Sequence, residues 1–484
     1  MRYLLGIDVG TTGAKVALFD EAGRFIDGAG QEYPLLHPAP DQVEQDPEDW
    51  WRATVAATHE VLGRHADAAG AVAGLSVSTQ GGCTLLLDKE SRPLGNAISW
   101  LDTRSKDFCA KWAKDPGDAF FFQRAGWSMK SCLSLTQLEW LRVNRPDDFV
   151  RAALMVGTLD YMNLRLTGRA ASDSTNAAIS QLMSLKTLDW SDELLAFPQM
   201  QRGKMPPIIP SGQPVGKLTV EAASELGVNR DAVVASGAHD QYCAALGAGV
   251  TEAGDCLLSC GTAWVTLAIT SRLVHDPAMR VYPGPHVVPG KWGLLQSVPV
   301  AGVVLRWFRE AFCEEMSYDE ISRAAASVPA GAEGLLFVTA PVGGGGFHFS
   351  GAQLNHSRGH FARAIMEGIV CRIRQCLENL AAIGAPTKRL VMIGGGAKSS
   401  VWPRIVTDLT GLRTDLPEVS EAACRGAAIL GGIGAGVFRD FTDAERRFII
   451  RSRTAPTSVN ARTVYEEHYR RFIEHAERLG LGSR

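Results

Sequence analysis

The sequence lacks several features that would place it in a specialised class of protein. It has no CxxC motif, and its ten cysteines are spread over 484 residues without paired spacing, which argues against a disulfide framework or a zinc site. The longest apolar run, residues 427–438, is too short and too rich in glycine to span a bilayer, which takes about 20 residues. The first residues lack the basic and apolar regions of a signal peptide. A cytoplasmic location is therefore expected.

An excess of either charge is also missing. Lys and Arg total 49 against 52 Asp and Glu, the formal net charge is -3, and no long block of like charge occurs. Nucleic acid is therefore not expected as a partner, nor is a membrane. The hydrophobic share of 46% and the charged share of 21% are typical of globular enzymes. The length exceeds that of one ordinary core, so two or three packed units are expected.

One strand-turn-strand pattern occurs twice. Residues 4–20 (LLGIDVGTTGAKVALFD) and 256–270 (CLLSCGTAWVTLAIT) each give a strand, a Gly-Thr turn and a second, alternating strand. A further strand that ends in a polar or glycine turn follows in each half, at residues 72–82 and 389–400. Helical patterns separate these strands, such as residues 46–65, which begin with Asp-Pro. We therefore predict an α/β fold of two domains with a cleft between them.

The boundary between these domains is expected near Asp240. A segment rich in proline and glycine, residues 205–216, precedes the second hairpin. We divide the chain into domains 1–243 and 244–484, although the same segment could be an excursion within the first domain.

The first Gly-Thr turn combines a carboxylate with a backbone suited to phosphate. Asp8 ends an apolar strand, and Gly10, Thr11 and Thr12 follow at once. Glycine lets phosphate oxygens approach the backbone, hydroxyls can donate to them, and a carboxylate suits the accompanying magnesium. Lys15 on the next strand adds a positive charge. The alternative is an ordinary hairpin with an edge aspartate, because glycine-rich turns are common.

Two glycine turns in the second half suit the same ligand. The turn at residues 260–264 (CGTAW) repeats the first cradle, and two opposed Gly-Thr hairpins suit a polyphosphate. The turn at residues 393–400 (IGGGAKSS) leads toward a helix, with Ser399 or Ser400 as N-cap and Pro403 in the first turn. Its glycines would let a flat ring or a phosphate lie against the backbone, although a plain strand-to-helix turn has the same composition.

Asp240 stands between a buried strand pattern at residues 233–237 and a helix of small residues. An unpaired carboxylate there would be costly without a partner or a role. At a cleft it could accept a proton from an attacking hydroxyl. The alternative is a helix N-cap, a position that aspartate favours.

Taken together, these motifs in this order resemble the FGGY family of carbohydrate kinases. The resemblance extends from Leu4 to about Gly436 and includes GLSVSTQGG, ISWLDTR, LTQLEWL, DYMNLRLTGRAASDSTNAA, GAHDQ, SCGTAW, IGGGAKSSVW and EAACRGAAI. It implies two actin-like (ribonuclease H-like) domains, ATP as phosphate donor with Mg²⁺, and a sugar or polyol hydroxyl as acceptor. Relatives also suggest a homodimer.

The resemblance also implies roles for individual residues. Asp240 matches the catalytic base, and Asp8 matches the residue near magnesium. The first phosphate loop corresponds to Thr11, Thr12 and Lys15, the second to Gly261 and Thr262, and the adenosine side to Gly395, Gly396, Ala397 and Ser399. Positions that line the sugar pocket correspond to Gln80, Gly81, Gly82, Trp100, Asp102, Arg104 and Gln241.

The motifs are most similar to those of the xylulose kinases in the family, but several positions differ. Gly81 and Gly82 replace a bulky Met-His pair, Gln241 replaces Asn, and Gln137 replaces a Lys of the family signature. Two glycines at the pocket wall would either enlarge the site or leave contacts to backbone and water. We expect a pentulose, or a somewhat larger ketose or polyol, and not glycerol.

Two other classes of protein share parts of this pattern. An actin-like ATPase without sugar kinase activity would have the hairpins but would not need Gln80, Trp100, Asp102 and Asp240. A sugar sensor that has lost catalysis would lack the base or the magnesium carboxylate, whereas both Asp8 and Asp240 are present. A sugar kinase remains the leading interpretation.

Overall fold

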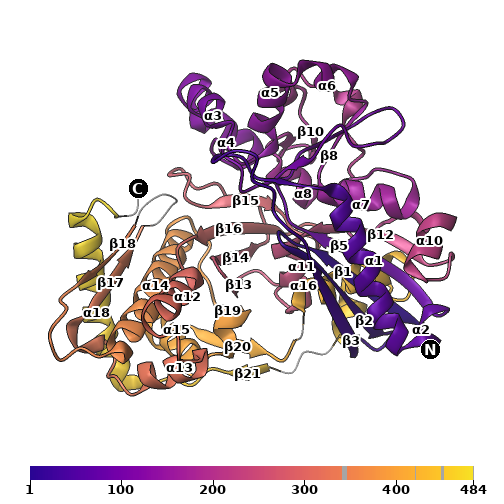
Figure 1. Ribbon diagram of the computed structural model, residues 1–484. Helices are drawn as coiled ribbons and strands as arrows, with labels where there is room; N and C mark the ends of the chain where they lie inside the picture. Colours follow the sequence, from indigo (N-terminus) through magenta and orange to yellow (C-terminus); the bar gives the residue numbers. More distant parts are fainter. Residues whose placement is uncertain (341–345, 420, 449–451, 483–484) are drawn as a thin grey trace. The chain divides into compact units, whose positions relative to one another are not determined.

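The computed structural model describes residues 1–340, 346–419, 421–448 and 452–482. The chain folds into two compact units (Figure 1). The first unit contains Met1–Gly249, Pro283–Trp292 and Val419–Ile449, and the second contains Val250–Tyr282, Gly293–Glu418 and Ile450–Arg484. The chain therefore returns to the first unit twice. Within the described ranges, no helix is long and apolar enough to cross a membrane.

A six-stranded sheet forms the centre of the first unit. The predicted hairpin is present as β1 and β2, which pair antiparallel with Asp8 opposite Lys15. The predicted strand at residues 72–82 is β5, which pairs parallel with β1 on its other side. The strands in sheet order are β11 (Pro214–Lys217), β12 (Val233–His239), β5 (Val72–Thr79), β1 (Tyr3–Val9), β2 (Gly13–Asp20) and β3 (Phe25–Glu32).

Helices cover both faces of this sheet. The predicted helix at residues 46–65 is α1 (Pro47–Arg64), whose N-cap Asp46 accepts the backbone N–H of Glu48. On the other face, α11 (Asp240–Gly247) packs on α16 (Ala422–Gly434), which contacts β1, β5 and β12. These two helices approach closely because glycines line their contact: a Cβ at Gly426 would lie 2.0 Å from the carbonyl oxygen of Cys243.

Shorter elements complete the first unit. Its remaining helices are α2 (Ala66–Ala69), α3 (Lys106–Trp112), α4 (Asp118–Ala125), α5 (Ser134–Asn144), α6 (Pro146–Arg151), α7 (Thr158–Thr167), α8 (Ser174–Ile179), α9 (Asp192–Leu195), α10 (Val220–Leu226) and α17 (Phe441–Arg447). Its short strands are β4 (Glu44–Gln45), β6 (Leu85–Leu87), β7 (Ala97–Ile98), β8 (Leu154–Val156), β9 (Met183–Ser184) and β10 (Asp189–Trp190).

The second sheet repeats the pairing of the first. The hairpin of β13 and β14 is antiparallel, β19 pairs parallel with β13, and β20 pairs parallel with β19. The first sheet has the same sequence of pairings in β2, β1, β5 and β12. The strands in sheet order are β15 (Tyr282–Pro285), β16 (Trp292–Val298), β14 (Trp264–Thr270), β13 (Asp255–Cys260), β19 (Arg389–Ile393), β20 (Arg413–Pro417) and β21 (Ser452–Thr454).

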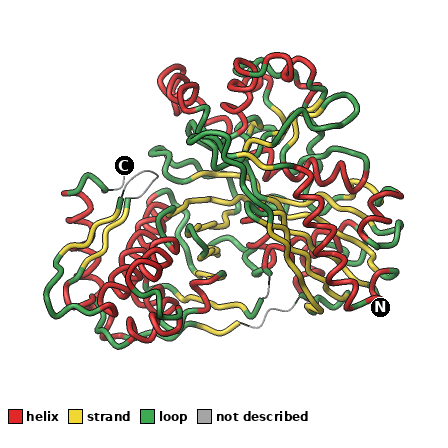
Figure 2. Tube along the Cα trace, viewed as in Figure 1, coloured by secondary structure: helices red, strands yellow, loops and turns green. Residues whose placement is uncertain are grey.

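A long central helix organises the core of the second unit. This helix, α14, buries Ile365, Ile369 and Leu380 among other apolar side chains, and the core continues into the strands of the sheet. Figure 2 shows the strands of each sheet flanked by helices. The helices of this unit are α12 (Gly302–Phe312), α13 (Tyr318–Ala326), α14 (Arg358–Ala382), α15 (Trp402–Thr410) and α18 (Val459–Arg478), and a separate hairpin consists of β17 (Leu336–Thr339) and β18 (Phe347–Ser350).

Candidate active site

A carboxylate lies near the end of the central strand of the first unit. Asp8 accepts a hydrogen bond from the Ser78 hydroxyl at 2.7 Å. Burial raises the pKa of the Asp8 carboxyl to about 7, although the Ser78 bond opposes the shift and the charges of Asp240 and Glu421 add to it. Because a nearby positive charge favours the ionised form, a bound cation would return Asp8 to its carboxylate form.

The fold explains why three carboxylates gather on one side of the sheet. Gly6 lies two residues before Asp8 and faces α16, because a Cβ there would lie 1.7 Å from the carbonyl oxygen of Cys424. Asp8 shares that side of β1, since strand side chains alternate. Asp240 is the first residue of α11, and Glu421 is the N-cap of α16. The two helix N-termini, which favour negative charge, thus bring their acidic residues toward Asp8.

The first Gly-Thr turn is held from three directions. The Tyr33 hydroxyl donates to the carbonyl oxygen of Gly10 at 2.6 Å. The Gln45 amide donates to the carbonyl oxygen of Thr11 at 2.6 Å, and the Trp100 indole donates to the Thr11 hydroxyl at 3.0 Å. These bonds fix the turn before any ligand binds, which lowers the cost of binding.

The neighbouring side chains of the turn are open to solvent. Thr12 and Lys15 are both exposed. The Lys15 ammonium lies 2.8 Å from the Glu421 carboxylate. Burial works against the charged ammonium, but the hydrogen bond and the charge of Glu421 raise the Lys15 pKa. Lys15 is therefore a cation that lies opposite Asp8 in the pairing of β1 with β2 and forms an ion pair with Glu421.

Asp240 is the first residue of α11 and not its N-cap. His239 occupies the N-cap position of α11, and no side chain makes a capping hydrogen bond there. Oδ1 of Asp240 is buried and has no hydrogen-bond partner in the described part of the chain, while the side chain as a whole is 33% exposed. The N-cap alternative is thus excluded by the structure. A carboxylate in this setting can accept a proton.

The residues predicted to line the sugar pocket lie in two kinds of environment. Trp100 is 39% exposed. Asp102 is fully buried and accepts the backbone N–H of Val43 at 2.7 Å and the Arg104 guanidinium at 2.8 Å. Burial raises the pKa of the Asp102 carboxyl. Arg104 also donates to Glu44 at 2.8 Å. Asp102 and Arg104 are thus engaged with the protein and brace the segment that presents Trp100.

The two glutamines of the predicted pocket also differ from each other. Gln80 is 3% exposed, and its amide donates to Gln45 at 2.7 Å. Because Gln45 also donates to the carbonyl oxygen of Thr11, Gln80 is connected to the first Gly-Thr turn. Gln241 follows Asp240 on α11, and its Oε1 has no hydrogen-bond partner among the residues that the structure describes.

Gly81 and Gly82 do not leave open space. A Cβ at Gly81 would lie 2.6 Å from the His239 ring and 2.8 Å from Ile179. Gly82 has a φ of +75°, and a Cβ there would lie 2.9 Å from Leu133. Of the two consequences expected from the sequence, enlargement of the site is therefore wrong. Neighbouring side chains occupy the volume that larger residues would fill.

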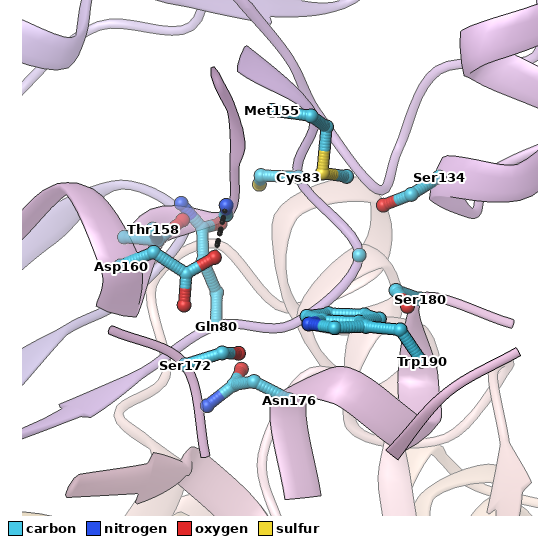
Figure 3. Close-up of a pocket in the computed structure, with 12 residues that line it drawn as sticks. Gln80, Cys83, Ser134, Met155, Thr158, Asp160, Ser172, Asn176, Ser180 and Trp190 are labelled. Carbon is cyan, nitrogen blue, oxygen red and sulfur yellow. Dashed lines mark hydrogen bonds between the residues drawn. The ribbon is translucent and has the colours of Figure 1, made fainter. Parts of the chain in front are cut away.

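A small polar cavity adjoins Gln80 (Figure 3). Its volume of about 20 Å³ is enough for a water molecule but not for a sugar. Asp160 accepts the backbone N–H of Gly157 at 2.7 Å, the dashed line in Figure 3, and burial raises its pKa to about 6. The other carboxyl oxygen, Gln80 Oε1 and Thr158 Oγ1 are buried without a hydrogen-bond partner among the described residues. The cavity is thus too small to be the substrate pocket.

The second unit has a pocket of about 470 Å³, a volume in the range of cofactor sites. Five residues predicted to bind the nucleotide line it, namely Gly261, Thr262, Gly395, Gly396 and Ser399. Ala397 is not among its lining residues and packs against the core of the unit. Trp264 and Trp402 also line the pocket, with ring centroids 4.7 Å apart.

Helices α12 and α13 contribute residues that the sequence did not indicate. Arg306 of α12 donates to the Thr262 hydroxyl at 3.0 Å, which places a cation at the second Gly-Thr turn. Ser322 of α13 lies 3.2 Å from Ser399, hydroxyl to hydroxyl. Ser399 accepts the backbone N–H of Trp402, although the N-cap position of α15 belongs to Val401. No motif marks these helix residues, because only the tertiary fold brings them to the pocket.

Comparison with known proteins identifies the architecture. Models of the N-terminal and C-terminal domains of the FGGY family of carbohydrate kinases match residues 3–247 and 256–435. The chain is 29% identical to the xylulose kinase of Bacillus subtilis (strain 168), over 93% of this chain and 91% of that protein. It is also 29% identical to the L-xylulose/3-keto-L-gulonate kinase of Escherichia coli (strain K12), over 97% and 96%.

A solved structure agrees with these sequence matches. The crystal structure of xylulose kinase from Rhodospirillum rubrum matches with a TM-score of 0.91 and 27% identity over 99% of both chains. The predicted fold of two actin-like α/β domains is thereby confirmed.

Proposed function

Because the chain belongs to the FGGY family of carbohydrate kinases, and is thus a sugar phosphotransferase, we propose that its acceptor is a ketopentose, first of all D-xylulose. The product would be D-xylulose 5-phosphate. The observation that carries the proposal is Asp240, a carboxylate at a helix start without a capping role. Kinases of this family use ATP as the phosphate donor.

In the proposed reaction Asp240 is the general base. It accepts the proton of the sugar hydroxyl while that oxygen forms a bond to the terminal phosphorus of ATP. The bond from this phosphorus to the bridging oxygen breaks, and ADP leaves with the electron pair. Positioning and charge neutralisation supply most of the acceleration in such transfers, so the turn residues Thr11, Thr12 and Lys15 are assigned to phosphate.

We assign the nucleotide to the pocket of the second unit. Gly261 and Thr262 would contact phosphate with Arg306 beside them, and Gly395, Gly396 and Ser399 would face the adenosine. Ala397 would act through the backbone of the same turn. This assignment is supported by the 470 Å³ volume and by the hydrogen bond from Arg306 to Thr262. In terms of function, residues 1–243 would carry the sugar pocket and first phosphate loop, and residues 244–484 the second phosphate loop and adenosine site.

Asp8 suits Mg²⁺ that arrives with the nucleotide. Among the described residues, no group of three or more ligating side chains could hold a metal ion. Mg²⁺ with a nucleotide needs only one or two carboxylates, because phosphates and water complete its coordination. Burial raises the pKa of Asp8 even though the charge of Lys15, opposite it on β2, acts to lower it. When bound, Mg²⁺ would supply positive charge that offsets the negative charge of the phosphates.

The names of the relatives favour a ketose. The Bacillus subtilis relative is a xylulose kinase, and the Escherichia coli relative acts on L-xylulose or 3-keto-L-gulonate. L-xylulose is therefore the second candidate. The predicted sugar-side residues would make the contacts. The Trp100 side chain is exposed, whereas Gln241 Oε1 is buried without a hydrogen-bond partner in the described part of the chain. The filled space at Gly81 and Gly82 argues for recognition through backbone and neighbouring side chains.

The test is ADP release with Mg-ATP against D-xylulose, L-xylulose, D-ribulose, L-ribulose, glycerol, erythritol, xylitol and gluconate. We expect D-xylulose to give the highest kcat/KM. Preference for glycerol would overturn the ketose assignment. No response to any member, with slow ATP hydrolysis alone, would overturn the pentulose assignment and point to larger or modified sugars.

A further inference from the structure

The residue before the proposed base has no role in the reaction described so far. His239 is the last residue of β12 and the N-cap of α11. It is 7% exposed, and its Nε2 lies 3.3 Å from Oδ1 of Asp240. We propose that His239 is a positioning residue for Asp240: its Nε2–H holds Oδ1, so that Oδ2 faces the hydroxyl that loses its proton. The inference rests on the proposed function, because it assumes that Asp240 is the base.

The backbone and ring of His239 are both fixed. Its backbone N–H donates to the Thr175 hydroxyl at 2.8 Å, and that hydroxyl donates to the buried Asp173 at 2.7 Å. The ring packs edge-on against Tyr242, with centroids 6.0 Å apart. A base oriented by a third, rigid group is a recurring device in active sites.

The hydrogen-bonding capacity of the two side chains indicates the tautomer. Oδ1 of Asp240 and Nδ1 of His239 are both buried, and neither has a hydrogen-bond partner within the described ranges. A neutral imidazole carries one N–H, and Nε2 is the nitrogen that faces the carboxylate. The separation of 3.3 Å is longer than most hydrogen bonds. Such bonds commonly shorten when substrate binds.

Gly81 gives the ring its room. A Cβ at position 81 would lie 2.6 Å from Cδ2 of His239, the carbon bonded to Nε2. Any larger residue would displace the edge of the ring that faces Asp240. The glycine at position 81, which distinguishes this chain from the Met-His pattern, is thus explained by His239, whose ring occupies the space that a larger side chain would need.

The test compares His239→Leu with His239→Gln. Leucine keeps much of the volume but has no donor, whereas glutamine can place an amide N–H near the Nε2 position. We expect His239→Leu to lower kcat by ~10-fold to ~100-fold, with KM for sugar and ATP changed by less than ~3-fold, since the hydrogen bond acts on the chemical step. His239→Gln should recover most of kcat. Equal kcat in the two variants would overturn the inference.

A second buried histidine provides the matched control. His286 also packs against Tyr242, with centroids 5.9 Å apart, and its Nε2 is buried without a hydrogen-bond partner among the described residues. It carries no role in the proposed reaction. His286→Leu should keep kcat within ~3-fold of wild type. Equal losses in His286→Leu and His239→Leu would show that His239 acts only through packing.

Gly81→Ala tests the same contact without altering the histidine. The added methyl group should lower kcat, and its effect should not add to that of His239→Leu, because both disturb one contact. Full additivity would contradict the inference. Failure of the underlying function is distinguishable, since it would appear as wild-type turnover in Asp240→Asn. Loss of turnover in Asp240→Asn with full turnover in His239→Leu would overturn only the role of His239.

Discussion

The two Gly-Thr hairpins have the same backbone plan and opposite chemistry. In the first unit, Asp8 and Lys15 face each other across β1 and β2, and Glu421 adds a third charge. In the second unit the turn end of the hairpin is uncharged, with Cys260 opposite Trp264. Arg306 of α12 brings a positive charge to this turn. The repeated fold thus supplies two Gly-Thr turns, and the carboxylates to which we assign proton transfer and metal binding, Asp240 and Asp8, belong to the first unit.

Among the proposed substitutions, loss of the base should cause the largest fall in turnover. Asp240→Asn keeps the shape of the side chain but removes its basicity, so turnover should fall by ~100-fold to ~10,000-fold. The variant should bind ADP as wild type does, because the nucleotide is assigned to the second unit. Turnover and ADP affinity measured on one preparation check both statements. Near wild-type turnover in the folded variant would remove Asp240 from the role of base.

Loss of Asp8 should cause the next largest fall in turnover. It should also change how the stability of the native state depends on pH. Asp8→Asn should reduce turnover by ~100-fold, since the charge that accompanies magnesium is lost. Because burial raises the Asp8 pKa to about 7, the native state holds a proton that the unfolded chain releases above its usual pKa near 4. The contribution of Asp8 to the stability of the native state therefore falls as the pH rises from about 4 to about 7.

The Asp8→Asn variant lacks this pH dependence of stability, because the asparagine amide does not titrate. Thermal unfolding without nucleotide or Mg²⁺ should show a gain in Tm for Asp8→Asn relative to wild type that is larger at pH 8 than at pH 5. A gain that is larger at pH 5 would mean that the Asp8 pKa is not raised.

A smaller, nucleotide-specific effect is expected in the second unit. Arg306→Leu should raise KM for ATP by ~3-fold to ~10-fold and leave KM for sugar unchanged, because the guanidinium lies at the second turn. Arg404→Leu is the matched control, since Arg404 pairs with Asp408 on α15 and does not line the pocket. Steady-state kinetics with each substrate varied separately would measure both. A rise confined to KM for sugar would reverse the assignment of the units.

The smallest effect is expected from the bonds that hold the first turn. Gln45→Leu removes the donor to Thr11 and the acceptor for Gln80, so kcat/KM for ATP should fall by ~3-fold to ~10-fold through a less ordered turn. Gln31→Leu, which removes an exposed bond to Glu60, should be nearly silent. Identical values for the two variants would show that the order of the first turn does not depend on Gln45.

Local patterns in the sequence were sufficient for the fold. Alternating apolar residues gave both hairpins, and Asp46 with Pro47 gave the start of α1, because these signals lie within a few residues of one another. The roles of Asp8 and Asp240 were suggested by the residues around them, with alternatives left open, and the family resemblance implies the same roles; both roles stay predictions.

Contacts between distant residues could not be predicted in the same way. Lys15 pairs with Glu421, which is 406 positions away and lies in a segment that returns to the first unit. Of the two consequences expected for Gly81 and Gly82, an enlarged site is wrong, because His239 and Ile179 fill the space beside Gly81. Arg306 was missed because the period of an amphipathic helix does not show which exposed residue borders a ligand pocket.

The most direct test of the division between the two units is hydrogen exchange with each ligand added alone. We predict that ADP slows exchange most strongly in peptides that cover residues 256–264 and 393–402. D-xylulose should slow it most strongly in peptides that cover residues 80–104 and 239–241. Strongest protection by the sugar in the second unit, or by ADP around Asp240, would contradict the account.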